Sequence, residues 1–220
     1  MKKEDLTEEQ YTKILEEFIN SLTKNGLKAT TMDGVASSLQ MSKRTLYELF
    51  GSKEEMFREA HQYFNKKLAT NLASIFDSSS NIMEAIIKCF LLIRDVMSRV
   101  NVDFIRDMEE YAIKGSLISE NHRRQNYQNF YDILEKGVRE GYFRNDVNLN
   151  IQCRMFAIQM ETLKRGEGLF PDDISLLEIY DNVIMGFLRA ISSTKGLNEL
   201  EKYLPSHATL SNHFEINNEN

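Results

Sequence analysis

The chain has 220 residues, of which 42% are hydrophobic, and it carries two prolines, ten glycines and two cysteines. That length and hydrophobic content can build one large or two modest domains, and the scarcity of helix breakers favours long helices. The formal net charge of −6 argues against a protein that coats nucleic acid without selectivity, because such binding depends on neutralising many phosphates.

No segment alternates β-branched residues between turn signals, so we expect an all-α fold. The N-terminus, MKKED, is charged and has no apolar leader. No run approaches the roughly 18 apolar residues that a membrane span needs. We therefore expect a cytoplasmic protein with no membrane partner.

The first predicted helix begins at a capping box, Thr7 to Gln10, and runs to Asn25 and Gly26. Its apolar residues recur at spacings of three and four, the pattern of a helix with one buried face. These residues are Tyr11, Ile14, Leu15, Phe18, Ile19 and Leu22.

Two short helices are predicted next, over residues 31–39 and 42–50, with N-caps at Thr31 and Ser42. The second has an apolar stripe and, opposite it, a polar face. Two such helices joined by a tight turn are typical of the helix-turn-helix, whose second helix fits the major groove of DNA. We expect a three-helix head with a core of Phe18, Leu22, Val35, Leu39, Leu46 and Phe50.

Residues 14–57 also carry a dense set of motifs at fixed spacing: TT at 30–31, VA at 35–36, MSKRTLY at 41–47, Phe50, and SKEEMF at 52–57. This pattern resembles the tetracycline-repressor (TetR) family of bacterial transcription regulators. A weaker likeness lies in GVREGYFR at 137–144. The resemblance implies a DNA-binding head, a larger helical body that binds an effector and dimerises, and regulation that is most often repression.

One position departs from the family pattern. The family usually has glycine in the turn between the two short helices, where this chain has Gln40. A positive φ at a residue other than glycine is uncommon and somewhat strained. Gln40 is therefore the one hint of an alternative function, a helical interaction or adaptor protein whose head no longer binds operator DNA.

Basic residues gather around the two short helices, although the whole chain is acidic. The resemblance implies groove contacts from Lys43, Arg44 and Thr45, and Arg44 is the candidate for a bidentate contact with guanine. It also implies phosphate contacts, and the remaining predicted DNA-binding residues are Lys28, Thr31, Ser42, Tyr47 and Lys53. Because one head spans few base pairs, we expect a homodimer on a near-palindromic, double-stranded operator.

Long helices make up the rest of the chain. Ser52 and Glu55 are predicted to cap each other's backbone N–H groups and to begin a helix that joins head and body. Further helices are expected over residues 82–100, 104–113, 119–140, 148–166, 175–192 and 197–204. The predicted domains are a helix-turn-helix head, 1–52, an effector-binding and dimerisation body, 53–193, and a short helix with a polar tail, 194–220.

The resemblance further implies a small-molecule effector in the body and pairing through its last two helices, 148–166 and 175–192. The apolar stripes of these helices fit pairing, but they also fit an ordinary core. Large, adaptable side chains on the expected lining helices favour an apolar or aromatic effector, although core packing also explains each one singly. The candidate ligand-binding residues are Met97, Phe104, Met108, Tyr111, Tyr127, Phe130, Phe156 and Met160.

Catalytic, cofactor and metal signals are lacking. No G-x-S-x-G elbow, P-loop, H-E-x-x-H or Cys–His pair of recognisable form occurs, so we expect neither an enzyme nor a cofactor. Asp107, Glu109 and Glu110 with His122 fit a solvated acidic face better than a metal site. Cys89 and Cys153 lie far apart within apolar helices and are expected to be reduced core residues.

Overall fold

The computed structural model describes residues 3–100, 120–165 and 174–203. Within those ranges the regular elements are helices, which confirms the all-α prediction. A 3-10 turn, Lys3–Asp5, comes first. The α-helices are α1 (Glu8–Ala29), α2 (Met32–Ser38), α3 (Lys43–Phe50), α4 (Lys53–Ser78), α5 (Ile82–Arg99), α7 (Glu120–Arg139), α8 (Leu149–Arg165), α9 (Leu176–Ile191) and α10 (Thr194–Tyr203). The predicted helix at 104–113 lies outside the described residues.

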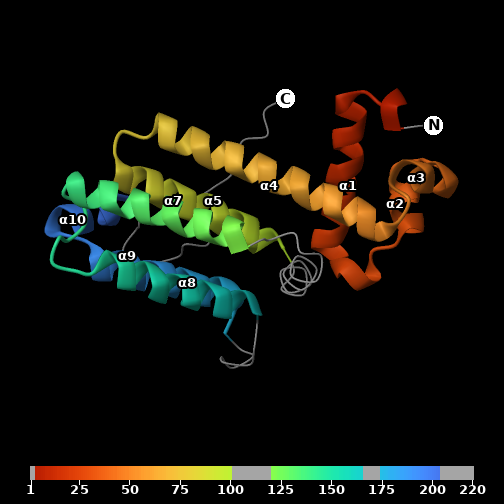
Figure 1. Cartoon of the computed structure of the whole chain (residues 1–220). Helices are drawn as coiled ribbons and strands as arrows, with labels where there is room; N and C mark the ends of the chain where they lie inside the picture. Colours follow the sequence, from red (N-terminus) through yellow and green to blue (C-terminus); the bar gives the residue numbers. More distant parts are fainter. Residues whose placement is uncertain (1–2, 101–119, 166–173, 204–220) are drawn as a thin grey trace.

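The first three helices form a head at one end of the molecule, and α5 and α7–α10 form a body at the other (Figure 1). Five of the six predicted head-core residues are buried, and Leu39 is half-buried. The head core also takes Met56, Phe57 and Ala60 from the first turns of α4. The first three helices therefore do not enclose this core by themselves, because the start of α4 covers part of it.

Local hydrogen bonds explain where the helices begin. The Thr7 hydroxyl accepts from the Gln10 amide over 3.2 Å, and the Gln10 side chain accepts from the Thr7 amide over 3.0 Å, so the first predicted capping box is confirmed. Gly26, with φ of 76°, interrupts α1 where its end was predicted, and a last helical stretch continues to Ala29. Asn81 caps α5 by accepting from the Glu84 amide over 2.9 Å.

The second predicted capping box is only half right. The Ser52 hydroxyl accepts from the Glu55 amide over 3.0 Å, as expected. The Glu55 carboxylate instead accepts from Arg58 Nη1 over 2.6 and 2.7 Å, and the Ser52 amide donates to the Phe50 carbonyl over 2.8 Å. An ion pair with arginine has thus replaced the expected bond from the carboxylate to the backbone.

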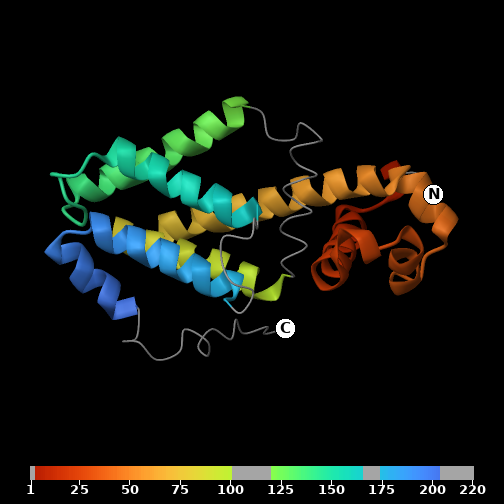
Figure 2. The ribbon, with the colours of Figure 1, turned by 90° about the horizontal axis from the view of Figure 1, so that it is seen from below.

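Helix α4 connects the two ends of the molecule. Its N-terminal turns pack in the head against α1, and its C-terminal part packs against α5 (Figure 2). Between these contacts most of its side chains are exposed or half-exposed. A displacement of α4 by the body would therefore be carried directly to the head.

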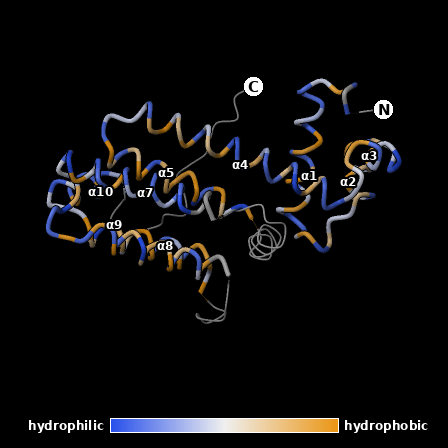
Figure 3. Tube along the Cα trace, in the orientation of Figure 1, coloured by the Kyte–Doolittle hydropathy of each residue, from blue (hydrophilic) through white to orange (hydrophobic). Residues whose placement is uncertain are grey.

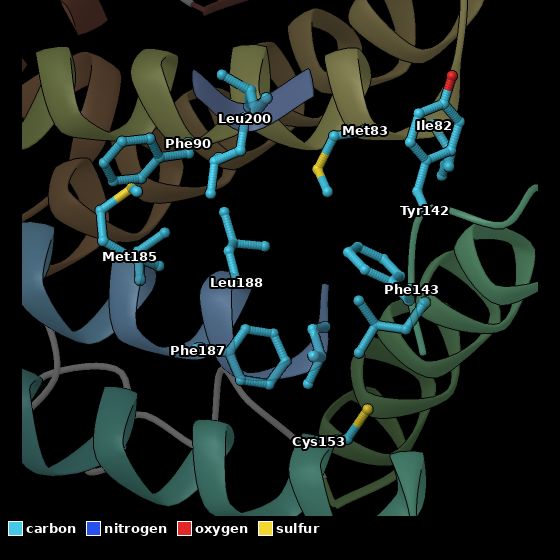
Figure 4. Packing of buried hydrophobic residues seen from close by; sticks show 14 of the residues in the cluster. Ile82, Met83, Phe90, Tyr142, Phe143, Cys153, Met185, Phe187, Leu188 and Leu200 are labelled. Atoms are coloured by element: carbon cyan, nitrogen blue, oxygen red, sulfur yellow. The ribbon is translucent and has the colours of Figure 1, made fainter. Parts of the chain in front are cut away.

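The body core is built from side chains of α5, α7, α8, α9 and α10. In Figure 4, Met83 of α5, Phe143 after α7 and Leu188 of α9 extend towards a common centre. Cys153 is buried in this core and Cys89 is half-buried, and both are free thiols. Burial raises the pKa of each thiol to about 11.

The turn after α7 is fastened to the junction of α9 and α10. The Arg144 amide donates to the Ile191 carbonyl over 2.8 Å, and the Ser193 amide donates to the Tyr142 carbonyl over 2.9 Å. Only glycine fits at position 196, because a Cβ atom there would lie 2.1 Å from the Tyr142 carbonyl oxygen. This close approach holds α10 against the turn after α7, and α10 also packs on α5.

Helix α10 begins three residues earlier than predicted. The Ser193 hydroxyl accepts from the Gly196 amide over 3.1 Å and so provides an N-cap that the sequence reading did not use. Polar and apolar residues alternate along this and the other helices in the manner of surface helices with one buried face (Figure 3). Among the described residues, no helix is long and apolar enough to cross a membrane.

Candidate functional site

The turn between α2 and α3 adopts a complete Schellman motif although it lacks glycine. The Met41 amide donates to the Ala36 carbonyl over 2.8 Å, and the Gln40 amide donates to the Ser37 carbonyl over 3.1 Å. Gln40 has φ of 54°, so the expected positive φ is present. The helix-turn-helix geometry therefore forms in this chain. Gln40 no longer argues for a head that does not bind DNA.

Helix α3 exposes one face to solvent. Leu46, Leu49 and Phe50 are buried in the head core and fix the helix in place. Lys43 and Arg44, in its first turn, are exposed. The N-terminal half of α3 thus faces solvent, and Figure 1 shows α2 and α3 at the outer end of the head.

The structure brings the predicted DNA-binding residues together around α2 and α3. Thr31 and Ser42 are exposed N-caps, which accept from the amides of Gly34 over 3.1 Å and Thr45 over 3.0 Å. Thr45 is half-exposed, and Lys28 and Tyr47 are exposed. Lys53 is half-buried, and its ammonium group donates to the Leu27 carbonyl, which ties the start of α4 to the end of α1.

Both cations in the first turn of α3 have acidic partners. Lys43 Nζ lies 2.7 Å from an oxygen of Asp33 on α2, and Arg44 Nε lies 2.9 Å from Glu48 Oε1 one turn along α3. The hydrogen bond to Asp33 raises the pKa of Lys43, and the bond to Glu48 raises the pKa of Arg44. Arg44 in turn lowers the pKa of Glu48. The sequence analysis did not predict either pairing.

The body gathers five of the predicted ligand-binding residues around its core. Met97, Tyr127, Phe130, Phe156 and Met160 are half-buried and pack against the core cluster. The others, Phe104, Met108 and Tyr111, lie outside the described residues.

An aromatic contact in the body was missed from the sequence. Phe187 of α9 lies 4.3 Å from Phe156 and 5.9 Å from Phe130, measured between ring centroids. An ion pair between two body helices was also not predicted. Arg94 Nε of α5 donates to both carboxylate oxygens of Asp181 on α9, over 2.8 and 3.0 Å. The residues in each of these contacts are at least 31 positions apart in the sequence, so no local sequence pattern predicts either contact.

An open groove of about 480 Å³ runs between α8 and α9. Its apolar lining includes Met155, Phe156, Val183 and Phe187. Beside it α8 exposes large apolar side chains at helical spacing. These are Ile151, Met155 and Ile158, which are 53%, 53% and 64% exposed.

Candidate metal ligands do not gather in the described part of the chain. No group of three His, Cys, Asp or Glu residues there could hold a metal ion. His61 is partly buried beside Phe57, which lowers its pKa through desolvation, and it contacts Asn65 rather than an acid. The acidic group around His122 lies outside the residues whose side chains are described.

Comparisons with known proteins agree with this geometry. A family model described as "Bacterial regulatory proteins, tetR family" matches residues 14–60. The HTH-type transcriptional repressor KstR2 of Mycobacterium tuberculosis is 27% identical over 135 residues, which cover 60% of this chain and 68% of that protein.

Solved structures share the fold over most of their length. The structure of the ketosteroid transcriptional regulator KstR2 of Mycobacterium tuberculosis has a TM-score of 0.59 at 21% identity, covering 86% of this chain and 97% of that one. The TetR family transcriptional regulator PfmR of Thermus thermophilus has a TM-score of 0.54 at 28% identity, covering 80% and 97%. The head and the helical body thus occur together in known regulators.

Proposed function

The chain belongs to the tetR family of bacterial regulatory proteins, and we propose that it is a dimeric repressor released from its operator by a small effector. Its relatives are transcriptional regulators, including a repressor, so regulation of transcription is the activity from which the finer proposal starts. The observation that carries the proposal is the exposed first turn of α3, held by a buried apolar stripe.

The proposed DNA interface is the outer surface of α2 and α3. A recognition helix in the major groove contacts base edges mainly with its N-terminal residues, which here are Lys43, Arg44 and Thr45. The N-cap residues Thr31 and Ser42 lie where hydroxyl and backbone amide groups contact phosphates. Tyr47, Lys28 and Lys53 complete the proposed interface.

The proposed dimer interface is the apolar face of α8 and α9. A monomer would leave Ile151, Met155 and Ile158 in water, next to an apolar groove. Contiguous exposed apolar surface of this kind marks an interaction site. A second copy that packs its own α8 and α9 on this face would cover both the stripe and the groove.

The proposed effector site lies in the body, beside the aromatic side chains of α7, α8 and α9. Phe130, Phe156 and Phe187 form an aromatic cluster there, and an apolar lining of this kind suits a bulky apolar molecule. One relative is described as a ketosteroid transcriptional regulator, which fits an effector of that general character. The effector must bind more tightly to the conformation with low DNA affinity, because only differential affinity shifts the equilibrium.

A mobility-shift titration tests the proposal. The full chain is titrated against duplexes that tile the DNA upstream of its own gene, with random-sequence duplexes of equal length as the control. We expect selective binding to one near-palindromic segment, two protomers per segment, and a log–log salt slope of about −0.9 for each phosphate neutralised. Absence of binding, or equal affinity for every duplex, would contradict the proposal and favour the adaptor function.

A further inference from the structure

Glu48 is placed to orient Arg44 for base recognition. The two residues lie one turn apart on α3, where side chains at i and i+4 are neighbours. The Arg44 side chain is 88% exposed and Glu48 is 40% exposed, so the arginine is the more accessible of the two. Glu48 therefore holds an arginine that stays largely exposed.

The Arg44 atom that Glu48 contacts decides which N–H donors of the arginine remain for DNA. The carboxylate accepts from Nε of Arg44 over 2.9 Å, and that bond uses neither Nη1 nor Nη2. The bond at Nε therefore leaves the two Nη groups of the planar guanidinium fork for another partner. The major-groove edge of guanine offers two acceptors, O6 and N7, that match two parallel N–H donors.

We propose that Glu48 is a specificity-determining positioning residue, which orients Arg44 towards a guanine and lowers affinity for other DNA. The inference rests on the proposed function of the head. Near DNA, the negative charge of Glu48 opposes the phosphates at every site, which weakens non-selective binding. At the operator, the orientation it gives to Arg44 compensates for that repulsion, so the two effects together raise the ratio of operator binding to random binding.

Two substitutions separate orientation from charge. Glu48→Gln removes the negative charge but keeps an oxygen that can accept from Nε. Glu48→Ala removes both the charge and the acceptor. Glu135 and Arg139 of α7 form the matched control, because they are also an i,i+4 pair, with 2.7 Å between Arg139 Nη1 and Glu135 Oε2. Glu135→Gln and Glu135→Ala change the net charge equally on a helix remote from α3.

The experiment measures dissociation constants by fluorescence anisotropy for operator duplexes with each base pair changed in turn, and for a random duplex. Arg44→Ala first identifies the base pair that Arg44 reads. We expect Glu48→Ala to lose roughly tenfold preference at that same base pair and to bind random DNA several-fold more tightly. Glu48→Gln should keep most of the preference while also binding random DNA more tightly. Both Glu135 variants should behave as the unmodified chain.

The outcomes are distinct. Wild-type preference in a folded Glu48→Ala variant, with melting temperature unchanged, would overturn the role of Glu48 but leave the proposed function intact. Equal loss of preference at all base pairs would also overturn it, because a positioning role concerns the one guanine contact. If the unmodified chain shows no sequence preference, the inference falls together with the proposed function.

Discussion

Tyr63 of α4 donates a hydrogen bond to Glu16 of α1 over 2.7 Å, and Lys67 donates to the same carboxylate oxygen over 2.8 Å. A reciprocal group lies nearby, in which Tyr11 of α1 and Lys3 both donate to Glu59 of α4. Thus α1 provides a carboxylate to a tyrosine and a lysine of α4, and α4 provides one to a tyrosine of α1 and to Lys3 of the preceding 3-10 turn. These bonds, together with the shared core, make α1 and the first half of α4 one unit.

Removing the Tyr63 hydroxyl should loosen this unit. Tyr63→Phe is expected to lower the free energy of unfolding by about 1 kcal/mol, the usual net contribution of a hydrogen bond. Urea denaturation of Tyr63→Phe, Glu16→Ala and the double variant gives the coupling energy between the two side chains. A coupling energy of zero would show that the bond does not tie the helices in solution.

The acid stability of the body should depend on Glu84. Bonds from Lys88 and from the Ser80 amide lower the pKa of Glu84 to about 2 in the folded chain, whereas an unfolded glutamate has a pKa of about 4.3. A depressed folded pKa contributes stability that is present above the unfolded pKa and is lost as the pH falls towards the folded value. Stability should therefore decline between about pH 4.3 and about pH 2 partly through this group.

Urea midpoints measured at steps across that acid range check this dependence. Glu84→Gln should flatten the decline, and Lys88→Met should flatten it as well, because Lys88 is the main cause of the lowered pKa. An acid decline of unchanged steepness in both variants would refute the assignment.

Glycine at position 40 should stabilise the head. Gln40 has φ of 54°, in the left-handed region, which costs roughly 1 kcal/mol for a residue with a Cβ atom. Gln40→Gly should raise the melting temperature, whereas Gln40→Val should lower it, because a β-branched residue fits that region least. Differential scanning calorimetry compares the three chains, and a lower melting temperature for Gln40→Gly would count against the strain.

Helix α10 should contribute strongly to body stability. Leu200 is fully buried against the body core, while Leu197 in the same helix is 36% exposed. Leu200→Ala should cost about 2 to 5 kcal/mol, as large-to-small changes in a core do, and Leu197→Ala less than about 1 kcal/mol. Chemical denaturation measures both, and equal costs would mean that α10 does not pack on the body in solution.

The proposed dimer should dissociate when charge enters its apolar face. Ile158 of α8 is 64% exposed in the single chain, and a carboxylate there would be buried without a partner in the dimer. Light scattering after size-exclusion chromatography should give a dimer for the unmodified chain and a monomer for Ile158→Glu. Ala73→Glu, at an exposed position in the C-terminal part of α4, is the control and should stay dimeric. A dimeric Ile158→Glu chain would place the interface elsewhere.

Much of the secondary structure was predictable because its signals are local. The capping bonds of Thr7, Ser42 and Asn81 each join residues three positions apart. The spacing of the apolar residues in α3 indicates which face of that helix is buried. The predicted ends of most helices agree with the structure within a few residues. The resemblance of the head likewise rested on a continuous stretch of sequence, which the family model also matches.

Local signals failed where a side chain had a choice of partners. Glu55 has the spacing of a capping box, but an arginine three residues further along the helix takes its carboxylate. The N-cap of α10 was missed because its apolar repeat begins only at Leu197, after the cap at Ser193. The first error concerns competition between alternative hydrogen bonds, and the second concerns a first turn that has no apolar signal.

The amino-acid order by itself determined the helices, the turn at Gln40, and the polar face of α3, since each depends on atoms a few residues apart. Only the packed molecule decided that Asp33 would meet Lys43, that Tyr63 would meet Glu16, and that α8 would leave its isoleucines in water. Such contacts depend on the angles at which whole helices cross, and those angles are set by the combined fit of many distant side chains.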